Sequence, residues 1–248
     1  MGLVHRDIST GNVMWLDGIG KLSDLEYCME YERGEQTLHN ELTVRKSDQS
    51  FPAHQEDYQG TPYFLSAEVL SHNYLYWPGD SENVGFWGRR SGQEAIFVTN
   101  YIHDAESLWW LLIYFILSTR PVGETNIPPE QVKERIAVYE KFFPTYDFIS
   151  TRKNVNENPF HSRNLFRALF VKEPYPKQYT SLLEFAFDSF RTKIVNVYRK
   201  AEEVNLKFDP SPMVGLHQEI EVLLSGMLRS AKSAGEFVFL KNHNRRVK

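Results

Sequence analysis

The chain has 248 residues, 42% of them hydrophobic, and a formal net charge of −4. A core of substantial size can be buried in one large or two small domains, and the mild negative charge, without a basic stripe, argues against a nucleic-acid-binding protein. The single cysteine, Cys28, excludes an intrachain disulfide, and no Cys/His cluster has the spacing of a zinc site, so we expect an intracellular protein, cytoplasmic or nuclear.

The first half of the chain predicts little regular structure apart from one β-hairpin near its start. Asn12–Leu16 and Ile19–Leu22 are typical of two short strands, and Asp17-Gly18 between them is a favourable two-residue turn. Glu30–Gln59 is polar and has no sustained period, which predicts a long loop. Pro, Gly and aromatic residues in His72–Ser91 indicate an irregular surface segment.

The second half of the chain predicts helices. Asp104 is a plausible N-cap, and Ser107–Leu117 is apolar nearly all round, as a helix buried on every side requires. The apolar run is about half as long as the roughly 20 residues of a membrane-spanning helix, so no membrane association is expected. Apolar residues spaced three and four apart predict three further helices. These helices follow Pro128 and Pro129, begin near Thr180, and cover about Val214–Arg229.

The clearest chemical signal is His5-Arg6-Asp7, followed after four residues by Asn12. This is the spacing of the catalytic loop HRDxxxxN, in which the Asp accepts the proton of a substrate hydroxyl and the Asn binds a metal ion. Four fixed residues occur by chance about once in 10⁵ positions. The pattern therefore predicts Asp7 as a catalytic base and Asn12 as a second catalytic residue that also binds metal.

Asp24 stands twelve residues after Asn12, beyond the predicted hairpin. A protein kinase places there the Asp of its DFG motif, which chelates the magnesium that bridges the phosphates of the nucleotide. Carboxylate and amide oxygens suit such a metal, and the metal neutralises the charge of a transferred phosphoryl group. Taken alone, Asp24 would more readily be a turn or capping residue, but its distance from Asn12 favours the metal site.

Two further motifs follow in the order that a kinase would have. Gly60–Glu68 resembles the end of an activation segment, with Ser66-Ala67-Glu68 where Ala-Pro-Glu usually stands, and Thr61 would face the catalytic Asp. Asp104 resembles the residue at the start of a buried helix whose carboxylate accepts backbone N–H groups of the catalytic loop. The sequence leaves open which basic side chain pairs with Glu68.

The chain is similar to the fungal-type protein kinase domain family over about residues 3–120, through the runs Val4–Asn12, Lys21–Tyr27, Gly60–Glu68 and Asp104–Trp110. The resemblance implies a protein kinase-like (α+β) fold, with residues 1–235 as a mainly α-helical C-lobe that starts with a short β-hairpin, and residues 236–248 as a C-terminal tail. It also implies Mg²⁺ and ATP as cofactors and Ser/Thr of a protein substrate as acceptor.

The resemblance also assigns roles to individual residues. Asp7 and Asn12 would be catalytic, and Asn12 and Asp24 would bind Mg²⁺ and ATP. Structural or regulatory roles are implied for His5, Arg6, Thr61, Glu68 and Asp104.

Four departures from the kinase pattern affect these expectations. Only four residues precede His5, so we expect the N-lobe, with its glycine-rich loop and strand lysine, to be missing and ATP to bind weakly. Ser9 stands where many Ser/Thr kinases have a lysine, and Leu25-Glu26 replaces Phe-Gly after Asp24, which removes the hinge freedom of glycine. The stretch between Asp24 and Glu68 is long for an activation segment; it is either a solvated insert or a source of phosphosites that Arg6 could pair with.

Three functions remain open at this point. The first is a protein Ser/Thr kinase that uses Asp7, Asn12 and Asp24. The second is a non-catalytic module in which the helical lobe binds partners through its exposed face, since large exposed apolar patches favour association. The third is a small-molecule phosphotransferase, such as a choline or aminoglycoside kinase. Asp24-Leu25-Glu26 and Ser9 favour it, whereas the Gly60–Glu68 segment and Asp104 oppose it.

Overall fold

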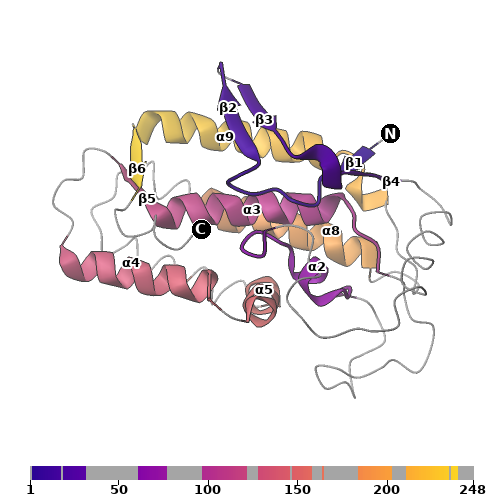
Figure 1. The fold of residues 1–248 in the computed structure, drawn as a ribbon, viewed down its shortest axis with the longest axis horizontal. Coiled ribbons are helices and arrows are strands. Elements are labelled where there is room, and N and C mark those ends of the chain that lie inside the picture. Colours follow the sequence, from indigo (N-terminus) through magenta and orange to yellow (C-terminus); the bar gives the residue numbers. More distant parts are fainter. Residues whose placement is uncertain are drawn as a thin grey trace. The chain divides into compact units, whose positions relative to one another are not determined.

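The computed structural model describes residues 2–17, 19–31, 61–76, 97–121, 128–145, 147–157, 164, 184–202, 211–234 and 236–239. The chain divides into two compact units, Met1–Leu108 with Val197–Met213, and Trp109–Asn196 with Val214–Lys248. The described residues are mainly helical, with small antiparallel sheets of two strands (Figure 1). The predicted long loop Glu30–Gln59 is wrong at its start, because Glu30 and Tyr31 belong to a short strand, and the rest of it lies outside the described residues. Most of the predicted surface segment His72–Ser91 also lies outside them.

The first unit holds two separate pairs of antiparallel strands. β2 (Val13–Leu16) and β3 (Ile19–Leu22) form the hairpin that the sequence predicts, with Asp17 at φ 52° in its turn. β1 (Gly2–Val4) pairs with β4 (Met29–Tyr31), which was not predicted. The β1–β4 pair closes the loop that carries the candidate catalytic residues.

Every described residue of β2 and β3 is exposed, although most of them are apolar. Trp15 is 72% and Ile19 62% exposed. A two-stranded hairpin has little stability of its own in water. The hairpin is therefore an apolar surface on both of its faces.

Two helices of the first unit begin with a side-chain cap. α2 (Ala67–Ser71) follows Ser66, whose hydroxyl accepts the N–H of Val69 at 3.3 Å. α3 (Tyr101–Ser118) follows Asn100, whose Oδ1 accepts the N–H of Ile102 at 2.9 Å. The prediction of Asp104 as an N-cap is therefore wrong: the cap is Asn100, four residues earlier, which already supplies the capping oxygen.

The part of α3 in the second unit is buried on all sides, as predicted. Trp109, Trp110, Ile113 and Leu117 have 0% exposed surface. The indole N–H of Trp109 donates to the backbone oxygen of Ala186 at 2.7 Å, so the polar atom of this buried ring is satisfied.

The remaining helices agree with the sequence pattern except in two places. α4 (Pro129–Phe142) begins with proline as predicted, but α5 (Phe148–Glu157) was not expected. The helix expected near Thr180 is described from residue 184 and contains a π-helical segment, η2 (Phe185–Arg191), that continues into α8 (Thr192–Glu202). Five apolar residues are predicted to share one face of this helix. Leu183 lies outside the described residues, and the other four are buried: Phe187, Phe190, Ile194 and Tyr198.

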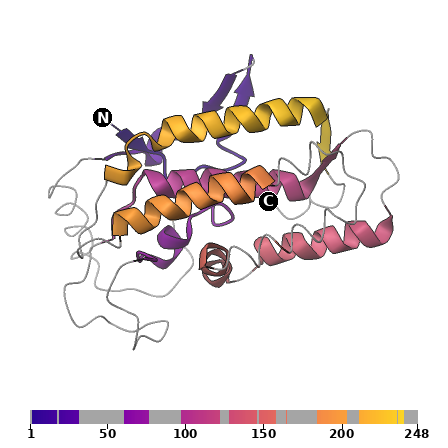
Figure 2. The same cartoon turned by 180° about the vertical axis from the view of Figure 1, so that it is seen from behind.

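The last elements complete the two units. The second unit contains α9 (Leu216–Ala234), which packs against η2 and is seen along its length in Figure 2. In the same unit β5 (Thr119–Pro121) pairs with β6 (Phe237–Phe239), a strand that lies in the segment expected as a tail. Short 3-10 turns at Leu25–Tyr27 and Ser211–Met213 belong to the first unit. That residues 1–235 form a single lobe stays a prediction.

Across the part of the chain that the structure describes, none of the helices combines the length and the apolar character needed to cross a membrane.

Candidate active site

The loop between β1 and β2 holds its shape through short-range backbone contacts. The N–H groups of Asn12 and Val13 both donate to the backbone oxygen of Ser9, at 3.2 and 3.1 Å, and the N–H of Gly11 donates to the hydroxyl of Ser9 at 3.3 Å. Arg6 has φ 71°, a left-handed conformation that is uncommon for a residue other than glycine. Such strain persists only where surrounding contacts enforce it, and it is frequent at functional sites.

Asp7 lies at the centre of this loop and is held by two residues. Nδ2 of Asn12 donates to Oδ2 of Asp7 at 2.8 Å and to its backbone oxygen at 2.9 Å. The backbone N–H of Thr61 donates to the other carboxylate oxygen, Oδ1, at 2.9 Å. Asp7 is half-buried and Asn12 is buried. The structure therefore fixes the orientation of the Asp7 carboxylate from both sides.

Asp24 is connected to this centre through its neighbour Ser23. The N–H of Ser23 donates to the backbone oxygen of Asn12 at 2.9 Å, and Nε2 of His5 lies 2.9 Å from the backbone oxygen of Ser23. Asp24 itself is exposed, has left-handed backbone angles of φ 61° and ψ 53°, and makes no capping hydrogen bond at the turn that follows it. Its side chain therefore does not act as a helix cap.

Asp104 accepts two backbone N–H groups of the loop. His5 donates to Oδ2 at 2.5 Å and Arg6 to Oδ1 at 2.9 Å. Burial raises the pKa of Asp104, while these two hydrogen bonds act in the opposite direction. The contact that the sequence led us to expect is present, and it joins the first turn of α3 to the loop.

Arg6 extends its guanidinium to Met29, with Nη1 2.8 Å from Sδ. The phosphosites that Arg6 was suggested to pair with are Thr37, Thr43, Ser47 and Ser50, and they lie outside the described residues. That regulatory role stays a prediction.

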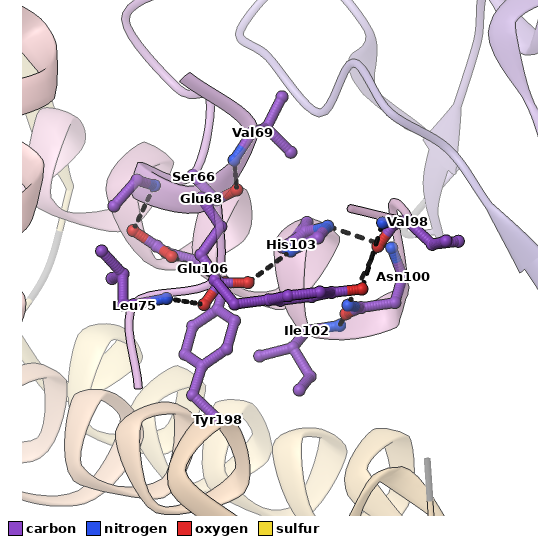
Figure 3. Close-up of polar contacts among 12 residues, drawn as sticks. Ser66, Glu68, Val69, Leu75, Val98, Asn100, Ile102, His103, Glu106 and Tyr198 are labelled. Carbon is purple, nitrogen blue, oxygen red and sulfur yellow. Dashed lines mark hydrogen bonds and ion pairs between the residues drawn. The ribbon is translucent and has the colours of Figure 1, made fainter. Parts of the chain in front are cut away.

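Glu68 is fully buried and is bound by two donors, as Figure 3 shows. Its Oε1 accepts the N–H of Leu75 at 2.9 Å, and its Oε2 lies 3.0 Å from Nε2 of His103. Burial raises the pKa of Glu68 to about 8, with a smaller raising effect from Glu106 and lowering effects from hydrogen bonds with Glu202 and Leu75. The sequence left open which basic side chain pairs with Glu68. Among the described residues, the side chain that donates to Glu68 is His103.

His103 is a neutral donor in this pair. Burial lowers its pKa to about 4. The backbone N–H of Asn100 donates to Nδ1 of His103 at 3.0 Å, so Nδ1 carries no proton and the ring proton is on Nε2. Nε2–H therefore donates to Glu68.

Two more buried carboxyl groups lie around α2. Oε1 of Glu106 accepts the N–H of Ala67 at 3.1 Å, and its Oε2 accepts the hydroxyl of Tyr198 at 2.8 Å. Oε2 of Glu202 accepts the N–H of Tyr76 at 2.7 Å. Sequence reasoning missed these residues and His103. The available signal was a His and a Glu in the first turns of an otherwise apolar helix, where unpaired polar side chains are rare.

No group of three or more His, Cys, Asp and Glu side chains within the described ranges could hold a metal ion. The expected magnesium site, made of one Asn and one Asp, would not form such a group. Amide and carboxylate oxygens are nevertheless the ligands that Mg²⁺ prefers, and in phosphoryl transfer the substrate phosphates supply the remaining ligands. Asn12 and Asp24 therefore fit magnesium by their chemistry.

Residues 1–116 match the model of a family described as fungal protein kinase. This range contains every site residue that the sequence predicts. No curated protein and no solved structure matches the chain.

Proposed function

We propose that this chain, whose residues 1–116 belong to the fungal protein kinase family, transfers the γ-phosphoryl group of Mg-ATP to a serine or threonine of a protein. Family membership implies a kinase-like fold and, in general terms, the use of ATP and Mg²⁺. The observation that carries the finer proposal is the position of Asp7 between the side chain of Asn12 and the backbone of Thr61. In a kinase the catalytic-loop Asp accepts the proton of the acceptor hydroxyl, and the Asn of the same loop binds a metal ion.

Asp7 acts as the general base in this proposal. Its carboxylate would accept the proton of the acceptor hydroxyl as the oxygen of that hydroxyl bonds to the γ-phosphorus, while the bond from the γ-phosphorus to the bridging oxygen breaks and ADP leaves. Asn12 and Thr61 hold the two carboxylate oxygens in one orientation before the reaction. Positioning of this kind removes part of the entropic barrier.

Asn12 and Asp24 are the proposed metal ligands. Both hydrogens of the Asn12 amide nitrogen are used on Asp7, so a cation would be bound through Oδ1. Asp24 would contribute its exposed carboxylate. Bound Mg-ATP supplies the phosphoryl group and the positive charge that stabilises it during transfer. The single cysteine supports an intracellular site of action as part of the same proposal.

The test uses the full-length product of the native transcript, whose 5′ end is read first, because a kinase carries its glycine-rich loop and strand lysine upstream of the catalytic loop. The purified protein is incubated with γ-labelled Mg-ATP, together with a panel of acceptor proteins or of amino-alcohols and aminoglycosides. We expect label on Ser or Thr of a protein. Label on a small molecule would favour the small-molecule phosphotransferase instead, and no transfer to any acceptor would refute the kinase proposal.

A non-catalytic binding module is the second candidate, and the exposed hairpin favours it. β2 and β3 present Trp15 and Ile19, 72% and 62% exposed, to the surroundings. A surface of this kind promotes association with a protein partner. Titration of Mg-ATP into the protein separates the two candidates, since a module of this kind gives no calorimetric signal.

A further inference from the structure

Helix α2 is buried at its start, where its backbone needs partners. Ala67 is 1% exposed and Glu68 0%. The first N–H groups of a helix have no partner within the helix. Ser66 satisfies that of Val69, but the N–H of Ala67 donates to Glu106, a residue of α3, at 3.1 Å. The start of α2 is therefore fixed by a carboxylate from another helix.

A second link joins α2 to the same turn of α3. Nε2–H of His103 donates to Glu68 at 3.0 Å, and the side chain of Glu68 also binds the N–H of Leu75 beyond the end of α2 at 2.9 Å (Figure 3). Asn100 holds His103 as a neutral donor through Nδ1. The pair is therefore a hydrogen bond from an uncharged imidazole and needs no cationic side chain.

The start of α3 also holds the catalytic loop. Asp104, between His103 and Glu106 in sequence, accepts the N–H groups of His5 and Arg6. One helical turn thus binds α2 through two residues and the catalytic loop through a third. Because these residues belong to one rigid turn, the relative position of α2 and the loop is set by them.

A short turn before α2 connects this helix to Asp7. The N–H of Phe64 donates to the backbone oxygen of Thr61 at 2.9 Å, and Phe64 and Leu65 are 2% and 3% exposed. The N–H of Thr61 in turn donates to Asp7. Only five residues separate Thr61 from the start of α2, so a displacement of α2 moves Thr61 away from the carboxylate.

We propose that His103 and Glu106 are positioning residues for phosphoryl transfer, which fix α2 and thereby hold Thr61 and the acceptor-binding segment against Asp7. The inference rests on the proposed kinase function. It adds His103 and Glu106, which do not touch the reacting atoms, to the residues needed for transfer. It also makes a neutral histidine, rather than a cationic side chain, the hydrogen-bond donor to Glu68.

Two pairs of variants of the full-length protein test the proposal. His103→Gln keeps a donor toward Glu68, and His103→Leu removes it. Glu106→Gln keeps an acceptor for the N–H of Ala67, and Glu106→Met removes it. His217→Leu and Glu221→Met on α9, both at exposed positions, are matched controls. Circular dichroism checks that each variant folds.

Amide hydrogen exchange is the first measurement, because it does not depend on activity. In His103→Leu and Glu106→Met we expect exchange at Thr61, Ala67 and Leu75 to accelerate by about tenfold or more, since these amides lose the contacts that protect them. The Gln variants and the controls should stay within about threefold of the parent. Unchanged exchange in the folded Leu and Met variants would overturn the proposal.

Phosphoryl transfer is the second measurement. We expect His103→Leu and Glu106→Met to raise KM for the protein acceptor by about tenfold with KM for ATP unchanged, and the Gln variants to restore it. If KM for the protein acceptor rose as much in the Gln variants as in the Leu and Met variants, the residues would have a structural role only, and the proposal would be overturned. If the parent protein shows no transfer while the exchange pattern is as expected, the kinase function fails but the fixing of α2 stands.

Nitrogen-15 NMR of the unmodified protein covers the case in which the Leu and Met variants do not fold. The proposal expects a neutral His103 ring with its proton on Nε2 at pH 7. A ring protonated on Nδ1 or on both nitrogens would contradict it.

Discussion

The backbone N–H of Thr61 donates a hydrogen bond to Oδ1 of Asp7 at 2.9 Å, across 54 residues of sequence. The contact joins the candidate catalytic loop to the segment that leads into α2. It uses a backbone donor, so it does not depend on the side chain at position 61. What it requires is an acceptor oxygen at position 7.

Asp7→Asn is expected to reduce phosphoryl transfer by about 10²–10⁴-fold, because the amide cannot accept the proton of the acceptor hydroxyl. The amide oxygen can still accept the N–H of Thr61, whereas the hydrogen bond from Nδ2 of Asn12 to the second carboxylate oxygen is lost. Circular dichroism checks that the variant folds. Initial rates with a protein acceptor give the measurement. Asp17→Asn in the exposed hairpin turn is the control, and activity retained in Asp7→Asn would remove Asp7 from the mechanism.

Asp104→Ala is expected to destabilise the protein by about 3 kcal/mol, because two N–H groups lose a charged acceptor. These are the N–H groups of His5 and Arg6. Asp104→Asn keeps one acceptor oxygen and should cost about 1 kcal/mol. Urea unfolding measures both values. Equal stability of the Ala variant and the parent would mean that the catalytic loop does not need this anchor.

Stability is expected to fall as pH rises above about 6.5, through Glu68. Its pKa is raised from 4.5 to about 8 in the folded protein. The folded state therefore keeps a proton that the unfolded state has released, and the free energy of unfolding decreases with pH through this window. Urea unfolding at pH 6.5 and 8 should show the decrease, and Glu68→Gln should flatten it. If the free energy of unfolding still decreased with pH in Glu68→Gln, the decrease would come from other groups.

His103 acts in the opposite sense at acidic pH. Its pKa is lowered from 6.5 to about 4, so the unfolded state binds a proton that the folded state does not. This contribution to the free energy of unfolding is lost as pH falls from 6.5 toward 4. Between pH 4.5 and pH 6.5 the effect of His103 opposes that of Glu68. We therefore expect the free energy of unfolding to be nearly independent of pH in this range. His103→Gln should then reveal the slope of Glu68 alone, whereas an unaltered profile would contradict the assignment.

Trp15→Ser is expected to weaken self-association. The side chain is 72% exposed on an apolar hairpin, so its removal reduces the apolar surface that favours contact between copies. The free energy of unfolding should change by less than about 0.5 kcal/mol, as for other surface substitutions. Sedimentation velocity over a concentration series measures association. Val222→Ser, at a 70% exposed position on α9, is the control, and equal behaviour of both variants would exclude the hairpin as an association surface.

The parts of the site that sequence could predict are those fixed by short spacing. Asp7 and Asn12 lie five residues apart in one loop, and Asp24 follows one hairpin later, so their proximity comes from local chain geometry. The contact of Asp104 with the loop spans 99 residues and was expected only because a known family has a residue of this kind there. Local pattern alone would not have shown it.

The parts that sequence could not predict depend on tertiary context. The partner of Glu68 is a histidine 35 residues away. Its place near the start of an apolar helix indicates that the ring is paired, but the sequence does not show which residue it pairs with. The pairing of β1 with β4 joins strands of three residues each, too short to show a period. The start of α3 was misplaced because Asn100 and Asp104 are both good capping residues, and the choice between them depends on which side chain reaches a free N–H.

The first turn of α3 has a consequence for how this chain can change during evolution. His103, Asp104 and Glu106 each serve a different partner, in α2 or in the catalytic loop. The apolar residues that follow can be exchanged for one another as long as volume is kept, because packing is shared among many neighbours. No such sharing exists for three polar residues with separate partners. Volume-conserving apolar substitutions should therefore be tolerated along the helix after Trp109, whereas at His103, Asp104 and Glu106 only side chains that keep the hydrogen bond should be accepted. Saturation mutagenesis of α3 would then divide the helix into these two parts.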